Sequence, residues 1–123
     1  MVWRAGDGGN LTWSGPQWTV YTGQAESESH GMGWLDPVHP EDRDTALMNW
    51  SKAAEMGGFE VEYRIREAST DEYRWFHTRA TPVRDENGNI IEWLGTSTDV
   101  EDLRSLQARQ EALVAELRNK AAP

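Results

Sequence analysis

The sequence predicts an α+β domain in which short helices cover one face of a five-stranded antiparallel sheet and a further helix leaves the sheet at its C-terminal end. Two patterns carry this prediction: apolar residues with helical spacing before residue 58 and after residue 99, and the shorter period of strands between them. With 123 residues, 37% of them hydrophobic, the chain has the length and composition of one domain with a modest core.

Two short strands open the chain. Residues 1–5 and 10–13 are typical of strands, and Gly6-Asp7-Gly8-Gly9 between them is typical of a hairpin turn, because Asp-Gly and Gly-Gly tolerate positive φ. Ser14 then predicts a helix N-cap, with Pro16 in the first turn.

A longer helix and three strands follow. Residues 40–57 begin with proline and two acids and continue with apolar side chains three and four apart, which predicts a helix. Residues 59–66 alternate apolar with charged side chains and predict a half-buried strand. Two more strands are expected over 73–84 and 89–98, joined by a turn at 85–88. Both of them place apolar groups on both faces, so that one face would pack on the helices and the other needs a second cover.

Residues 99–120 predict a helix with Asp99 as its N-cap. Its apolar positions recur with the a/d spacing of a coiled coil, and a polar Gln110 occupies one a position. The alternative is a helix that packs on its own domain. The expected dimer seam consists of Leu103, Leu106, Gln110, Leu113 and Leu117.

Composition excludes several kinds of function. The absence of cysteine rules out disulfides, cysteine-ligated zinc, iron–sulfur clusters and thiol catalysis. The net charge is −9 and residues 1–98 carry 16 of the 21 acidic side chains, which argues against nucleic-acid binding. No catalytic or phosphate-binding motif occurs, so we expect neither an enzyme nor a metal site in this segment. No long apolar run or leader occurs either, and we expect no membrane segment and a cytoplasmic location.

Five collinear motifs carry a resemblance to a known family. They are Gly33-Trp34-Leu35-Asp36-Pro37-Val38-His39-Pro40-Glu41-Asp42-Arg43, Glu62-Tyr63-Arg64-Ile65-Arg66, Tyr73-Arg74-Trp75, Pro82-Val83-Arg84-Asp85-Glu86-Asn87-Gly88 and Gly95-Thr96-Ser97-Thr98-Asp99-Val100. The chain resembles PAS domains of the third subclass, in which the later motifs form the PAC motif. The resemblance implies the PAS fold, with a sensor domain over residues 1–99 and a signalling linker helix over 100–123.

Residues 106–117 resemble the linker that precedes the phosphoacceptor box of HWE-type sensor histidine kinases. This resemblance implies a homodimeric sensor module of a two-component histidine kinase. Its partners would be a kinase domain further along the same chain and a response regulator. The alternatives are a PAS domain that binds other proteins without a ligand, and a sensor for another output such as a diguanylate cyclase.

In such a fold, aromatic rings would either surround a ligand cavity or fill the core themselves, and we favour the second interpretation because each ring occupies a large volume. The cysteine-adduct photochemistry of flavin-binding relatives is excluded, and haem is not expected because residues 41–57 contain no histidine. We therefore expect no cofactor, and the sequence does not identify a small-molecule ligand. The candidate lining is Trp18, Tyr21, Trp34, Trp50, Tyr63, Phe76, Thr78, Ala80, Trp93, Gly95 and Ser97.

Asp99 matches the aspartate of the family's Asp-Ile-Thr signalling element, which here reads Asp99-Val100-Glu101, so that the threonine contact is expected to be lost. The resemblance implies that Asp99 caps the exit helix and accepts a hydrogen bond from a strand arginine, Arg64 or Arg66. The alternative is an N-cap without any role in signalling.

Overall fold

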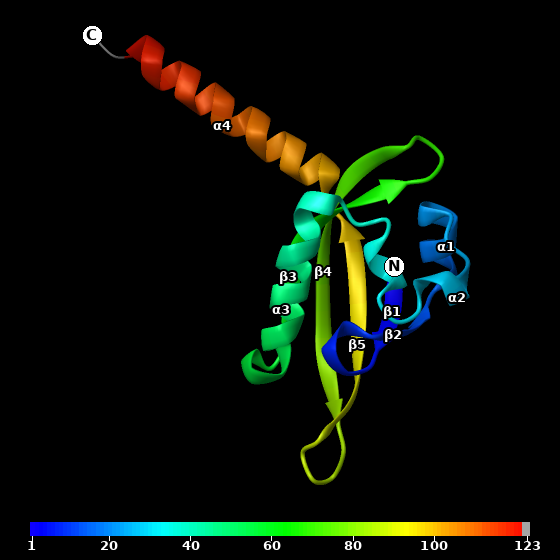
Figure 1. Cartoon of the computed structure of the whole chain (residues 1–123). Helices are drawn as coiled ribbons and strands as arrows, with labels where there is room; N and C mark the ends of the chain where they lie inside the picture. The colour runs from blue at the N-terminus through cyan, green and yellow to red at the C-terminus, as the bar shows by residue number, and fades with distance from the viewer. Residues whose placement is uncertain (122–123) are drawn as a thin grey trace.

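The computed structural model describes residues 1–121 and confirms the predicted fold class (Figure 1). All five strands pair antiparallel, in the order β2-β1-β5-β4-β3. The strands are β1 Val2–Ala5, β2 Leu11–Ser14, β3 Phe59–Glu67, β4 Glu72–Arg84 and β5 Ile90–Asp99. The helices are α1 Pro16–Thr22, α2 Glu26–Ser29, α3 Arg43–Met56 and α4 Glu101–Ala121, with 3₁₀ turns η1 Asp7–Gly9, η2 Gly33–Leu35 and η3 Pro40–Asp42.

The helices α1 to α3 cover one face of the sheet, which we call the inner face. Along β4 the side chains of Phe76, Thr78 and Ala80 are buried, while their neighbours are more exposed, as a strand with one covered face requires. The register places Thr78 opposite Ser97 and Ala80 opposite Gly95 on β5. The inner face therefore collects groups from every strand of the sheet.

The core is built around the indole of Trp50 on α3. This ring stacks on Phe59 with centroids 4.1 Å apart, and it meets Trp3 and Trp93 edge-on at 5.9 and 5.5 Å. Such aromatic pairs add about 0.5–1.5 kcal/mol each to the gain from burial. Trp50 thus fixes α3 to β1, β3 and β5 at once.

The first hairpin differs from the sequence prediction in one respect. Ser14 does not cap α1, because it is the last residue of β2 and its hydroxyl points inward, 2.9 Å from the hydroxyl of Ser29. Gly15 precedes α1 instead and makes no side-chain cap. Of the predicted turn glycines, Gly8 and Gly9 adopt positive φ but Gly6 does not, and Gly9 lies so close to the ring of Trp50 that a Cβ would approach it at 2.9 Å.

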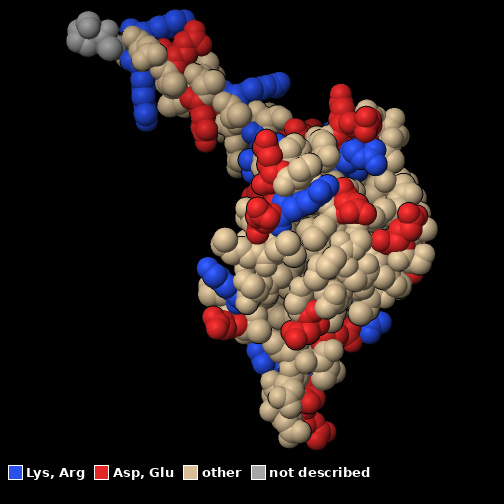
Figure 2. All heavy atoms as spheres, viewed as in Figure 1, with Lys and Arg blue, Asp and Glu red and all other residues tan. Residues whose placement is uncertain are grey.

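The exit helix α4 projects away from the body of the domain, beyond the end of β5 (Figure 1). None of its described residues is buried. Acidic and basic side chains are interspersed along it (Figure 2). Asp99, predicted as the N-cap of this helix, ends β5 and lies two residues before the helix begins.

Candidate functional site

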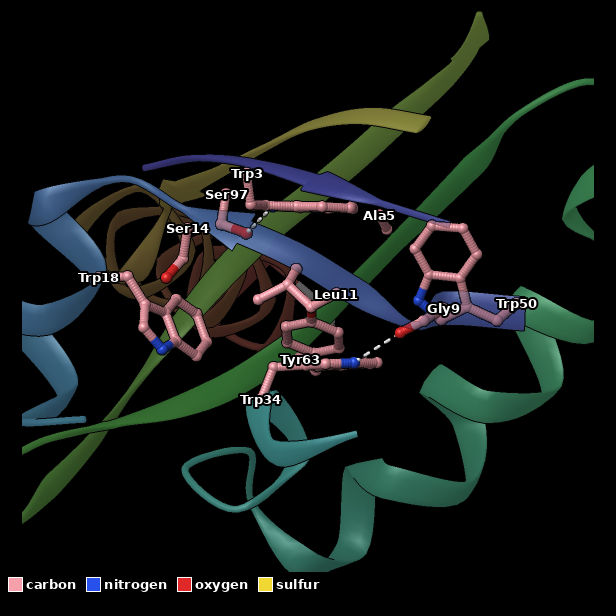
Figure 3. A pocket seen from close by; sticks show the side chains of 10 residues that line it. All are labelled: Trp3, Ala5, Gly9, Leu11, Ser14, Trp18, Trp34, Trp50, Tyr63 and Ser97. Atoms are coloured by element: carbon pink, nitrogen blue, oxygen red, sulfur yellow. Dashed lines mark hydrogen bonds between the residues drawn. The ribbon is translucent and has the colours of Figure 1, made fainter. Parts of the chain in front are cut away.

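A small cavity lies between the inner face of the sheet and the helices (Figure 3). Its volume of about 20 Å³ is enough for about one water molecule, which needs some 10–15 Å³. Aromatic rings therefore fill most of the space that they enclose. The lining residues are Trp3, Ala5, Gly9, Leu11, Ser14, Trp18, Trp34, Trp50, Tyr63 and Ser97.

The structure brings together only part of the lining expected from the sequence. Trp18, Trp34, Trp50, Tyr63 and Ser97 do line the cavity. The other expected residues lie outside it: Tyr21, Phe76, Thr78, Ala80, Trp93 and Gly95. The first hairpin contributes lining residues that were not predicted: Trp3, Ala5, Gly9, Leu11 and Ser14.

Polar groups at this cavity are already engaged in hydrogen bonds within the protein. The indole N–H of Trp3 donates to Ser97 Oγ at 3.2 Å, and that of Trp34 donates to the carbonyl of Gly9 at 2.8 Å. Ser97 Oγ also lies 3.1 Å from Thr78 Oγ1. Burial raises the pKa of the Tyr63 hydroxyl to about 12, so this group stays neutral at physiological pH. The cavity wall thus offers ring faces and neutral hydroxyls, but no charged side chain.

Tyr21 and Phe76 instead form one side of a wider, open groove near the end of β5. Their rings meet edge-on with centroids 5.0 Å apart. The Tyr21 hydroxyl donates to the carbonyl of Ile65 at 2.9 Å, which joins α1 to β3. The groove, of about 340 Å³, also borders Ser97 and Asp99. It therefore places part of the expected aromatic set beside the start of the exit helix.

Asp99 forms the junction between the sheet and α4. Its Oδ1 accepts a hydrogen bond from the amide of Glu101 at 2.9 Å, so Asp99 caps α4 as predicted. Its Oδ2 accepts from Nε of Arg74 at 2.7 Å. This hydrogen bond raises the pKa of the Arg74 guanidinium, which stays charged. A second, longer contact joins Arg74 to Asp102 at 3.5 Å.

The prediction that Arg64 or Arg66 donates a hydrogen bond to Asp99 is therefore wrong. Asp99 lies opposite Phe76 on the adjacent strand β4, so Arg74, two residues away on that strand, reaches it. Arg64 and Arg66 lie one strand further away on β3. Arg64 bonds instead to the carboxylate of Asp42 at 2.9 Å, and Arg66 to that of Asp71 at 3.0 Å.

Glu101, at the position of the family's threonine, joins α4 to β4. Its Oε2 accepts from the backbone N–H of Trp75 on β4 at 2.8 Å, and the amide of Val100 donates to the carbonyl of Trp75 at 2.8 Å. The guanidinium of Arg104 lies over the Trp75 ring, with Cζ 3.8 Å from its centroid. The sequence analysis gave no role to Trp75 or Arg104, although the Tyr73-Arg74-Trp75 motif was a signal.

The leucines of the expected seam are all exposed on α4. Leu103, Leu106, Leu113 and Leu117 are each more than half exposed. The alternative prediction, a helix packed on its own domain, is not what the structure shows, because α4 packs on the sheet through its first turn, at β4 and at Glu62 on β3, and every described residue after Arg104 is exposed. The stripe of leucines is thus unpartnered within the described part of the chain.

Residues 1–121 contain neither a candidate metal-binding cluster nor a helix that could span a membrane. No group of three or more His, Asp or Glu side chains in this range lies close enough to hold a metal ion. No helix in the same range is both long and apolar enough to cross a membrane. His39, which precedes α3, accepts the amide N–H of Glu41 on Nδ1 at 3.1 Å.

The fold is that of a PAS domain, and the chain belongs to the PAS family: the family model for the PAS fold matches residues 10–97. The chain is similar to the peroxide stress-activated histidine kinase mak1 of Schizosaccharomyces pombe, with 34% identity over 112 residues, which cover 87% of this chain and 7% of that kinase. It spans 7% to 17% of the length of the curated relatives it matches.

Solved structures show the same fold. One is the N-terminal domain of a diguanylate cyclase with a PAS/PAC sensor from Marinobacter aquaeolei, with a TM-score of 0.70 and 23% identity, covering 84% of this chain and 96% of that one. Another is a sensory box histidine kinase/response regulator from Burkholderia thailandensis, with a TM-score of 0.67 and 23% identity, covering 96% of this chain and 89% of that one. PAS domains of this fold thus occur in proteins with different outputs.

Proposed function

We propose that this chain is the sensor and dimerisation module of a two-component sensor histidine kinase of the HWE type. Residues 1–99 would form the cytoplasmic PAS sensor and residues 100–123 the linker to a kinase domain, the last two of them outside the described part of the chain. The observation that carries the proposal is α4, which is tied to the sheet at Asp99 and then exposes a leucine stripe. The similarity to a histidine kinase supports the choice of output.

In this proposal the signal passes from the sheet to α4 through Asp99. A change in the core or in the groove beside Tyr21 would move the end of β5 and with it the Asp99–Arg74 pair. The helix would then shift between two arrangements within a pair of helices, which changes the geometry of the downstream kinase domain. A response regulator would receive the phosphoryl group from that kinase.

Dimerisation through α4 is tested with Leu106→Glu combined with Leu113→Glu. Each leucine buried in a seam contributes about 1.5–3 kcal/mol, so the double variant should weaken self-association at least about a hundredfold. Ala108→Glu with Ala115→Glu is the matched control, because it adds the same charges with the same spacing on the opposite side of the helix. Sedimentation velocity at micromolar concentration reads the result, and equal behaviour of both double variants would contradict the seam.

Two alternatives make different predictions. A PAS domain that only binds other proteins should show no retained ligand in native mass spectrometry after mild purification, whereas a retained ligand supports the sensor. The alternative of a cyclase output is suggested by the similarity of the fold to the N-terminal domain of a diguanylate cyclase. In the longer chain that contains this domain, transfer of the γ-phosphate of ATP to a histidine supports the kinase, and its absence together with cyclic dinucleotide synthesis supports the cyclase.

A further inference from the structure

Two guanidinium groups lie over the ring of Trp75 on the outer face of the sheet. Arg104 from α4 lies over the ring with Cζ 3.8 Å from the centroid, and Cζ of Arg64 from β3 is 5.0 Å from it. Both distances are within the roughly 6 Å over which a cation is attracted by an aromatic face. Arg64 is also the partner of Trp75 in the β3–β4 register, so the backbone keeps these two side chains adjacent.

Each guanidinium of this stack is held by a carboxylate from a different part of the fold. Arg104 Nη1 donates to Glu62 on β3 at 2.6 Å. Arg64 donates through Nε and Nη2 to both oxygens of Asp42 at 2.9 Å, and Asp42 also accepts the backbone N–H of Arg64. Although burial raises the pKa of the Asp42 carboxyl, these hydrogen bonds outweigh it and hold the pKa below its ordinary value. The stack therefore extends from the start of α3 to the first turn of α4.

The backbone of Trp75 holds the same turn of α4. Its N–H donates to Glu101 and its carbonyl accepts from Val100, both at 2.8 Å. Beyond Arg104, every described residue of α4 is exposed. The attachment of α4 to the domain is thus confined to one turn, and Trp75 contributes to it with both backbone groups and its ring.

We propose that Trp75 is the positioning residue that couples the start of α3 to the exit helix. We call the Arg64–Trp75–Arg104 stack a latch, because its contacts would fix the direction of α4. Loss of the Asp42–Arg64 pair at the start of α3 would weaken these contacts. The effect of this latch on a downstream domain rests on the proposed function. The latch itself is a property of this chain and can be measured without any downstream domain.

Hydrogen exchange of the 123-residue chain, read by mass spectrometry, tests the latch, because exchange in native conditions reports local opening. Arg104→Ala removes both the cation–aromatic contact and the ion pair with Glu62, so it should speed exchange of the amides of residues 101–108 by about threefold to thirtyfold. Arg104→Lys keeps a charge for Glu62 but loses the planar group over the ring, so it should lie between Arg104→Ala and the natural chain. Arg109→Ala, on the exposed part of the same helix, is the control and should leave these amides unchanged.

The coupling between α3 and α4 needs a second measurement. Asp42→Asn removes the charge that holds Arg64 but retains an acceptor for its backbone, and it should speed exchange in residues 101–108 although α4 is not touched. In a Trp75→Leu chain, the same Asp42→Asn change should add nothing. Each comparison is repeated with Leu106→Glu and Leu113→Glu present, so that self-association does not protect α4. The core amides of Thr78 and Ala80 serve as the check that the fold is intact.

The outcomes separate the two proposals. Unchanged exchange in Arg104→Ala, or an equal effect of Asp42→Asn with and without Trp75, overturns the latch. If Arg104→Ala also speeds the core amides, the milder Arg104→Lys decides, and an unaltered rate in that variant overturns it as well. If exchange responds as expected but Arg104→Lys leaves phosphorylation in the longer chain unchanged, the latch stands and the relay to a kinase fails.

Discussion

Replacing Asp99 by asparagine separates a relay from a simple helix cap. Asparagine and aspartate are about equally good N-caps, so the hydrogen bond to the amide of Glu101 should survive. The substitution removes the negative charge that faces Arg74. The Arg74 side chain is 33% exposed and that of Asp99 is 38% exposed. At that exposure an ion pair contributes about 0.2–1 kcal/mol. We therefore expect a fall in melting temperature of no more than about 5 °C.

The functional effect should be larger than this small loss of stability. Arg74 contacts both Asp99, the last residue of β5, and Asp102 in the first turn of α4, so under the proposed relay a weaker pair would shift the balance between helix arrangements. We expect a severalfold change in the initial rate of histidine phosphorylation in the longer chain that carries this domain. Arg74→Gln should give the same change, and the two substitutions together should not be additive.

Asp71→Asn is the matched control for this experiment. It removes the same charge from an exposed pair, with Arg66, at the same end of the sheet but away from α4. Asp71 adopts a positive φ of 59°, which asparagine also tolerates, so no new backbone strain is introduced. If Asp99→Asn and Asp71→Asn left phosphorylation equally unaffected, Asp99 would be a cap and not a relay.

Three other predictions concern the core and the pH dependence of stability. Gly95→Ala should lower the free energy of unfolding in urea by about 1–3 kcal/mol, because a Cβ there would overlap the ring of Trp3. Gly58→Ala is the control: its Cβ would meet only an atom 3.7 Å away, and its free energy of unfolding should be within about 0.5 kcal/mol of that of the natural chain. Trp3→Leu should relieve part of the Gly95→Ala penalty, and strict additivity of the two would show that the ring does not lie over Gly95. The pKa of the Tyr63 hydroxyl is raised to about 12 in the folded protein, so its contribution to the free energy of unfolding is complete below pH 10 and is lost as the pH rises toward 12. Tyr63→Phe should flatten this alkaline fall in stability. An unchanged slope of stability against pH would contradict the burial of the hydroxyl.

The order of strands and helices could be predicted because each element carries a local signal. Residues 59–66 alternate apolar and charged side chains, and in the structure they form most of β3. The turn at 85–88 contains the Gly88 that the backbone requires, with φ of 83°. Asp99 lies at the change from strand to helix, so its capping role followed from its position alone.

Contacts that depend on strand register and strand order could not be predicted in the same way. The pairing of β4 with β5 decides which residue contacts Asp99, and this pairing includes an irregularity next to Val83. A shift of the register by one residue would turn every side chain of the strand to the other face of the sheet. The place of Trp3 beside β5 is a pairing across some 90 residues, set by tertiary packing rather than by a local pattern. One signal was available: Gly95 interrupts a strand, which indicates the close approach of another group.

The energies at the exit junction are small enough that the proposed shift of α4 would leave the sheet intact. The Asp99–Arg74 pair, the Arg104–Glu62 pair and the Arg104–Trp75 contact lie at the surface and contribute about 0.2–1 kcal/mol each. Their sum of a few kcal/mol lies in the range over which a bound ligand can shift a two-state equilibrium. Beyond Arg104 every described residue of α4 is exposed, and helices in proteins owe most of their stability to the packing of an apolar face. A second copy that covers the leucine stripe would therefore order the helix, and the junction would decide in which direction the ordered pair points.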